Sequence, residues 1–210
     1  LNTADKTAVA WCWKAGNKTT VNNAGTVQST VSANQDAGFS IVKFTVPSSG
    51  ALTVGHGLSS PPEFMMIKPL SSFQWDVYHG SLAITEYLVL NTTATKDTGA
   101  TTVWNSTAPT NEVFSLGTAW ASASPNITDT IAYCWHSVEG YSKFGSYVGN
   151  GDTSGTADTR DGAFVYTGFR PAFFMMKGTE SGARWLMFDN KRDPVNPVIH
   201  DLNAHATDDE

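Results

Sequence analysis

Charged side chains are scarce in this chain of 210 residues. Asp, Glu, Lys and Arg make up 15% of the sequence, whereas an average globular protein has about 25%. The 13 basic and 19 acidic residues give a formal net charge of −6, and the basic residues form no cluster. Binding to a nucleic-acid backbone needs concentrated positive charge. The sequence therefore predicts no nucleic-acid partner.

Long apolar runs and cysteines are also rare. No apolar run approaches the ~18 residues that a membrane-spanning helix needs, so no membrane insertion is expected. The two cysteines, Cys12 and Cys134, occupy matching positions of an internal repeat. Equivalent points of neighbouring units rarely come within the ~7 Å Cα separation of a disulfide, so each cysteine is expected to be a buried strand residue.

Hydroxyl groups, glycine and aromatic rings are abundant instead. The 26 Thr and 19 Ser outnumber all charged residues, and the chain also has 18 Gly and 7 Trp. Threonine, valine and aromatic residues favour strands, and glycine favours turns. Because no stretch shows a sustained helical spacing of apolar residues, the sequence predicts an all-β protein.

An internal repeat is the most informative pattern in the chain. Four short strings recur in the same order, which is not a plausible accident. The matching pairs are Val9–Trp13 with Ile131–Trp135, Gly38–Ser40 with Gly140–Ser142, Pro62–Lys68 with Pro171–Lys177, and Trp75–Tyr78 with Trp185–Phe188.

The repeat predicts three parts. The string Ile131–Trp135 comes just before the second Gly-Tyr-Ser string, so it ends one unit as the next begins. Residues 38–139 are therefore predicted to be a complete β-sandwich unit, and residues 140–210 a second, C-terminally incomplete unit. Residues 1–37 are predicted to hold the last strand of a preceding unit plus a linker, with a connecting loop over 18–37. We expect the natural protein to extend beyond one or both ends.

Short β-branched and aromatic runs between Gly, Pro and Asn predict the strands. Many short strands in a unit of about 100 residues are typical of an antiparallel β-sandwich, so we predict jelly-roll-like sandwich units in tandem. The predicted strands are Ser40–Val46, Phe64–Ile67, Gln74–Tyr78, Tyr87–Leu90, Val113–Leu116 and Thr130–Trp135, followed by Lys143–Val148, Ala163–Tyr166, Phe173–Met176 and Arg184–Phe188.

Several motifs in the chain resemble those of one protein family. They are Val31–Asn34 with Ala37–Val42, Val54–Leu58 before Pro62–Phe64, Trp75–His79, Glu139–Tyr147 and Tyr166–Pro171. Together they look like a tandem-repeated β-domain of bacteriophage tail-fibre-like and other virion surface proteins, and the resemblance covers about Val9 to Phe188. It implies a place on the virion surface, other virion proteins as partners and a homo-oligomer, often a trimer. It implies no defined enzymatic activity.

Tryptophans are the best candidates for ligand binding. Trp75 and Trp185 recur in the repeat, so they are expected in cores, whereas Trp104 and Trp120 lie in polar stretches outside the repeated strings. An amphipathic ring among Asn, Ser and Thr suits stacking on a sugar or docking a neighbouring chain. Trp104 and Trp120 are therefore the predicted ligand-binding residues. The alternative is that both rings cover the end of the sandwich.

Three groups of residues are candidate metal ligands or bases, each with a plainer alternative. His56 could be a ligand or a base, or could belong to a glycine turn. His200 and His205, near acidic residues, could bind a metal or lie in a solvated tail. The acidic loop 149–162 offers oxygen ligands for Ca²⁺, but its spacing is not that of an EF-hand and a solvated hairpin loop is the alternative. We prefer the plainer alternative each time and predict no metal and no cofactor.

The sequence contains no recognisable catalytic motif. It has no Gly-x-Ser-x-Gly, no His-Glu-x-x-His and no phosphate-binding glycine loop. Carboxylates such as Asp152 with Asp161, or Glu63 with Asp76, would suit a glycosidase only at the right separation in space. The chain is therefore predicted not to be an enzyme.

The sequence as a whole predicts a virion structural protein, part of a fibre, spike or capsid-surface appendage. Its exposed loops would contact host surface glycans or neighbouring virion subunits. Weak contacts repeated over many copies can accumulate avidity. The alternatives are a carbohydrate-binding module or a glycan depolymerase of a larger protein.

Overall fold

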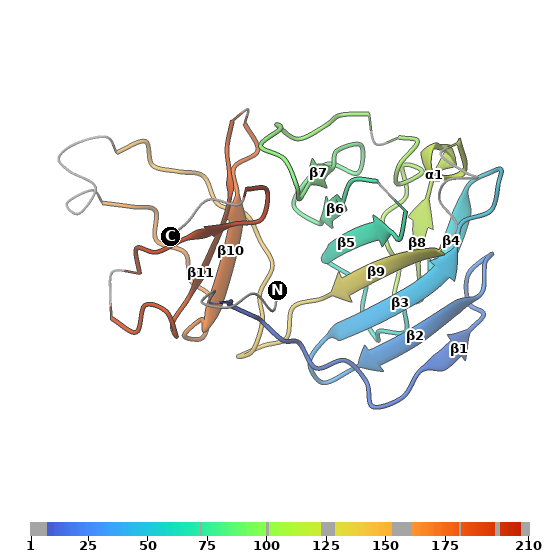
Figure 1. Cartoon of the computed structure of the whole chain (residues 1–210), viewed down its shortest axis with the longest axis horizontal. Coiled ribbons are helices and arrows are strands. Elements are labelled where there is room, and N and C mark those ends of the chain that lie inside the picture. Colours follow the sequence, from blue (N-terminus) through green and yellow to red (C-terminus); the bar gives the residue numbers. More distant parts are fainter. Residues whose placement is uncertain are drawn as a thin grey trace.

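In the computed structural model of the chain, the regular secondary structure is almost all β-strand, with one short helix in the described residues (Figure 1). It describes residues 8–71, 73–99, 101–122, 129–152, 161–180, 182–195 and 198–206. The described part has no helix that is long and apolar enough to cross a membrane. The elements are β1 (Thr20–Asn22), β2 (Ser29–Asn34), β3 (Phe39–Thr45), β4 (Leu52–Gly55), β5 (Phe64–Pro69), β6 (Asp76–His79), β7 (Leu88–Val89), β8 (Val113–Leu116), α1 (Thr118–Ser122), β9 (Asp129–Trp135), β10 (Phe173–Lys177), β11 (Trp185–Asp189) and β12 (Leu202–Asn203).

The largest sheet has seven strands in the order β1-β2-β3-β9-β5-β6-β7, and all neighbours are antiparallel. Figure 1 shows β9 lying between β3 and β5. Phe39 of β3 and Phe64 of β5 are both opposite Trp135 of β9. A strand distant in sequence therefore joins the two halves of the sheet.

The two faces of this sheet bury different side chains because successive strand residues point to opposite faces. One face packs against the two-stranded sheet of β4 and β8 and forms the first core. The opposite face forms the second core, which includes Trp185 of β11. The first core includes Val42, Phe44, Met65, Ile67, Ala132 and Cys134 from the large sheet and Leu52, Val54, Phe114 and Leu116 from β4 and β8; the second includes Phe39, Phe64, Val77, Leu88 and Trp135.

This arrangement confirms the predicted all-β, antiparallel, sandwich-like fold. Phe64–Pro69, Val113–Leu116 and Asp129–Trp135 match predicted strands closely. The arrangement in tandem units stays a prediction.

A second sheet has three strands in the order β10-β11-β12. Its first hairpin pairs Phe173 with Asp189 and Met176 with Leu186, while β5 and β6 pair Phe64 with His79 and Ile67 with Asp76. These are the residues that the sequence repeat matches, so both hairpins have the same register. The third strands agree as well, since β12 pairs with β11 as β7 pairs with β6.

The loop predicted over residues 18–37 is wrong. Two strands, β1 and β2, lie within it, and β2 pairs with β3 along its whole length. The large sheet therefore continues across the expected boundary between residues 37 and 38. These strands consist mostly of polar residues, and only Val31 and Ser29 of β2 are fully buried, so their sequence lacks the apolar signal of a strand.

Two strands predicted in the second unit are also wrong. Residues 143–148 and 163–166 form no strand, and their large apolar side chains are mostly exposed, up to 90% for Phe164. In the described part of the chain, neither segment pairs with another strand.

Candidate functional site

Trp104, one of the two predicted ligand-binding residues, is buried with 1% of its surface exposed. Its ring meets Tyr78 edge-on at a centroid distance of 5.8 Å, and its indole N–H donates to the Glu86 carbonyl at 3.2 Å. Asn105 and Ser106, which follow it, have positive φ angles of 54° and 46°. This turn directs the polar residues outward and the ring inward, so the expected exposure of Trp104 is wrong.

Trp120, the other predicted ligand-binding residue, is buried in α1 with 2% of its surface exposed. It packs in the first core, and its ring lies 6.3 Å from that of Phe73. The expected exposure is wrong here too. Both rings instead belong to the first core.

His56 has the geometry of a structural turn. It is fully buried, Nε2 lies 3.0 Å from the Thr110 carbonyl, and Nδ1 accepts the Leu58 N–H at 3.1 Å. Gly57 has a φ of +72°, which a glycine tolerates without strain. Desolvation by burial lowers the pKa of His56, and both ring nitrogens already have partners. The turn therefore accounts for this residue.

The other candidate ligands do not form a metal site in the described part of the chain, where no group of three potential ligands could hold an ion. His200 pairs with Asp193 through Nδ1 and Oδ1 at 2.7 Å. In the acidic loop, the Asp161 N–H donates to the Asp152 carboxylate at 2.8 Å. Asp158 of that loop lies outside the described residues.

The carboxylates of Glu63 and Asp76 are placed at opposite ends of β5. Glu63 precedes β5 and accepts a hydrogen bond from the Ser137 hydroxyl, while Asp76 lies opposite Ile67. Four strand steps separate the two positions, about 13 Å. The two carboxylates have different hydrogen-bond donors, the Ser137 hydroxyl for Glu63 and the Gln74 amide for Asp76.

Asp76 itself is an unusual acid. It is 3% exposed, and burial raises its pKa to about 7; a hydrogen bond from Gln74 opposes the shift, and the nearby charge of Asp97 adds to it. A carboxylic acid that is half-protonated near neutral pH occurs in active sites, but buried structural acids show the same shift. Asp76 lies inside the sheet, opposite Ile67 and Val89, and does not line the groove described below.

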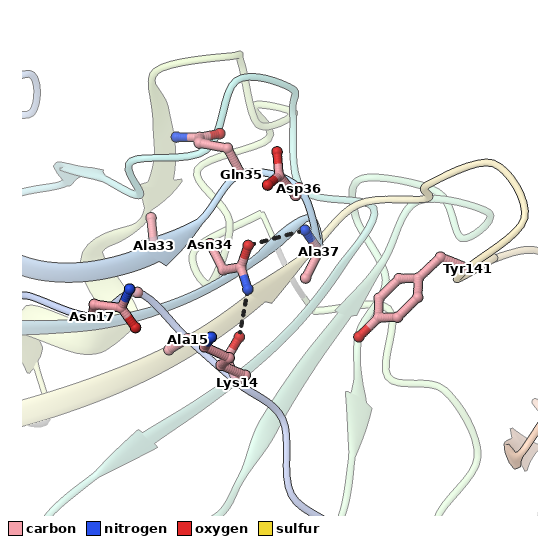
Figure 2. Close-up of a pocket in the computed structure, with 10 residues that line it drawn as sticks. Lys14, Ala15, Asn17, Ala33, Asn34, Gln35, Asp36, Ala37 and Tyr141 are labelled. Atoms are coloured by element: carbon pink, nitrogen blue, oxygen red, sulfur yellow. Dashed lines mark hydrogen bonds between the residues drawn. The ribbon is translucent and has the colours of Figure 1, made fainter.

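A polar groove of about 510 Å³ lies at the turn between β2 and β3 (Figure 2). The Asn34 side chain forms its floor by donating to the Lys14 carbonyl at 3.1 Å and accepting the Ala37 N–H at 3.2 Å. Gly16 lies against this floor, because a Cβ there would come within 2.5 Å of the Ala33 carbonyl oxygen. Tyr141 faces the floor from the opposite wall.

The rim of this groove presents free polar groups. The side chains of Lys14, Asn17, Asp36 and Tyr141 make no hydrogen bond or ion pair with the described part of the chain, and all four residues are exposed. An amide, a carboxylate and a phenol ring are suited to bind sugar hydroxyl groups and stack on the apolar face of a sugar ring. The volume lies within the range of small-molecule sites, about 300–1,000 Å³.

Sequence reasoning missed this groove because its parts are far apart in the chain. The turn 34–36 reads Asn-Gln-Asp, which indicates only a polar turn, and Tyr141 matches the buried Phe39 in the repeat. The one available signal was the change from Phe39 to Tyr141 at matching positions of the repeat, because the tyrosine adds a hydroxyl group to the ring.

No curated protein and no solved structure matches the chain. A family model matches it over residues 1–210, and so includes the residues of both walls of the groove. The chain therefore belongs to the family described as Domain of unknown function (DUF7483).

Proposed function

We propose that the chain is a non-catalytic attachment module on the surface of a virion, in a fibre, spike or capsid appendage, and that its polar groove contacts neutral glycans of the host surface. The motif resemblance to virion surface proteins supports the location. The groove supports the chemistry, and it replaces Trp104 and Trp120 as the proposed ligand site. Other virion proteins and further copies of the chain, in a trimer by resemblance, are its proposed partners.

The observation that carries this proposal is the set of free polar groups facing Tyr141. Asn17 and Asp36 have unused hydrogen-bonding capacity beside an exposed aromatic ring. A sugar supplies several hydroxyl groups and an apolar ring face, so it can use both features at once.

The charge of the groove favours a neutral ligand. Lys14 and Asp36 are the charged residues among its described lining, and their charges cancel. A phosphate or sulfate group would meet only one exposed ammonium group, which gives little affinity in water. Such a shallow site binds weakly, and attachment would then depend on many copies acting together.

A carbohydrate-binding module of a larger protein is the second candidate, because it would use the same groove. The two differ in location. Antibodies against the chain that label intact virions support the virion module, and labelling of a secreted enzyme supports the second candidate.

Glycan binding is tested on an array probed with the full chain displayed at high density. Replacing Tyr141 by alanine should weaken binding about tenfold, equivalent to about 1.4 kcal/mol. Tyr166→Ala is the matched control, since Tyr166 is an exposed tyrosine outside the groove. Absence of binding to any neutral glycan, or equal loss in both variants, would contradict the proposed groove.

A further inference from the structure

The outer edge of β10 lacks a partner strand. In the described part of the chain the second sheet runs β10-β11-β12, so β10 pairs on one side only. Its counterpart β5 pairs with β6 on one side and with β9 on the other, from Phe64 opposite Trp135 to Pro69 opposite Thr130. An unpaired edge presents a row of backbone N–H and C=O groups to which another strand can add. Among the described residues, the second sheet therefore lacks a strand that corresponds to β9.

The sequence repeat identifies a strand that fits this edge. Val9–Trp13 reads Val-Ala-Trp-Cys-Trp and matches Ile131–Trp135 of β9, which reads Ile-Ala-Tyr-Cys-Trp. If it pairs with β10 as β9 pairs with β5, Trp13 lies opposite Phe173, Cys12 opposite Phe174 and Val9 opposite Lys177. The pairing of β9 with β5 therefore supplies the register and the antiparallel direction expected for Val9–Trp13 on β10.

The N-terminal segment already lies beside β10 and β11 in the structure (Figure 1). The rings of Trp13 and Phe173 are 5.4 Å apart, and the corresponding rings of Trp135 and Phe64 are 5.5 Å apart. Trp11 contacts Phe173 at 5.3 Å, and its indole N–H donates to the carboxylate of Asp189, at the end of β11, at 3.2 Å. Residues 8–13 form no strand here, so these contacts are made by side chains alone.

We propose that Val9–Trp13 adds to the free edge of β10 as a fourth, antiparallel strand, within its own chain and with Trp13 opposite Phe173. The segment belongs to the same chain and already contacts Phe173, so its effective concentration exceeds that of any second copy in dilute solution. Pairing satisfies the backbone groups of both strands. The inference does not depend on glycan binding.

A disulfide tests the register in the full-length chain. Opposite residues of an antiparallel pair have Cβ atoms about 4.5–5.5 Å apart, close enough for a disulfide after small adjustment. Cys12 is an exposed free thiol, so Phe174→Cys should form a disulfide with it on mild oxidation. The denatured chain then has one free thiol instead of three, because Cys134 is buried and burial raises its pKa.

Two controls make this result specific. Phe174→Cys combined with Cys12→Ser should keep all its thiols free. Met175→Cys, one position off the proposed register and on the opposite face of β10, should form much less disulfide. Equal cross-linking at positions 174 and 175 would overturn the register. Disulfides between chains that increase with protein concentration would overturn pairing within one chain in favour of a second copy.

Hydrogen exchange on the unmodified chain gives an independent readout. Every second amide of β10 faces the free edge. If Val9–Trp13 pairs there, these amides should exchange about ten times more slowly than the same amides would with that edge unpaired. Trp13→Ala should remove this protection, whereas Val21→Ala, an exposed position on β1, should leave it unchanged. Fast exchange of those amides in the unmodified chain would overturn the proposal.

Discussion

The strands β5-β6-β7 and β10-β11-β12 are the same structure in two different surroundings. Their pairings agree residue for residue, yet Met65 of β5 is 1% exposed and its counterpart Phe174 is 41% exposed. The first set is joined to β9 and covered by β4 and β8. Among the described residues, the second set has no such neighbouring or covering strands. Strand register is therefore encoded within the hairpin, whereas burial depends on elements supplied from elsewhere.

Alanine substitutions at matched positions of the two hairpins should show the largest contrast. Met65→Ala removes a side chain from the first core and is expected to lower the free energy of unfolding by about 2–5 kcal/mol. Phe174→Ala should cost about 1 kcal/mol or less, because water already reaches the ring. Urea unfolding of both variants measures the difference. Equal losses would mean that the second sheet is as well covered as the first.

The buried acid of the first hairpin gives the next contrast, because its counterpart in the second is Leu186. The pKa of Asp76 is raised to about 7, so the folded chain keeps a proton that the unfolded chain releases near pH 4. The free energy of unfolding should therefore fall as pH rises from about 4 to 7, by at most about 4 kcal/mol. Above about pH 7 this loss is complete.

Asp76→Asn isolates this effect. The difference in unfolding free energy between the two proteins, measured from pH 4 to 8, should grow in favour of the variant as pH rises. His56 and His79, whose pKa values are lowered by burial, act in the opposite direction but are present in both proteins, so they cancel. A difference that does not change with pH would show that Asp76 is ionised throughout.

The smallest expected effect concerns two matching tryptophans, Trp75 just before β6 and Trp185 at the start of β11. Trp185 donates its indole N–H to the Val89 carbonyl at 2.9 Å and so links the two sheets, while Trp75 stacks on Tyr133 at 6.3 Å. Trp185→Phe should cost about 0.5–1.5 kcal/mol through the lost hydrogen bond, and Trp75→Phe less. Urea midpoints of the two variants give the comparison, and a larger loss at Trp75 would contradict the role of Trp185.

The sequence predicted strands such as β5, β8 and β9, because short apolar, β-branched and aromatic runs between turn residues indicate buried strands. It missed β1 and β2, whose outer residues are polar. It also predicted strands at 143–148 and 163–166, where the pattern is present but the described part of the chain supplies no partner strand. An apolar sequence pattern identifies a segment that can form a strand, but the strand forms only where a second strand pairs with it.

The site was less predictable than the fold. Polar neighbours suggested that Trp104 and Trp120 are exposed, but a turn with positive φ at Asn105 and packing on Phe73 place both rings inside. The groove depends on Tyr141 approaching the Asn34 turn, a contact between residues more than one hundred positions apart. No local pattern encodes such a contact.

The central place of β9 has a consequence for the order of folding. Thr45 of β3 and Asp129 of β9 are 84 residues apart, and β5 is also completed by β9. During synthesis β3 and β5 emerge long before the strand that joins them, and sheets dominated by such distant pairs form slowly. Until residue 135 has left the ribosome, the nascent chain exposes two apolar edges that can associate with neighbouring chains. The step that commits the large sheet to its final form is therefore the insertion of its last strand.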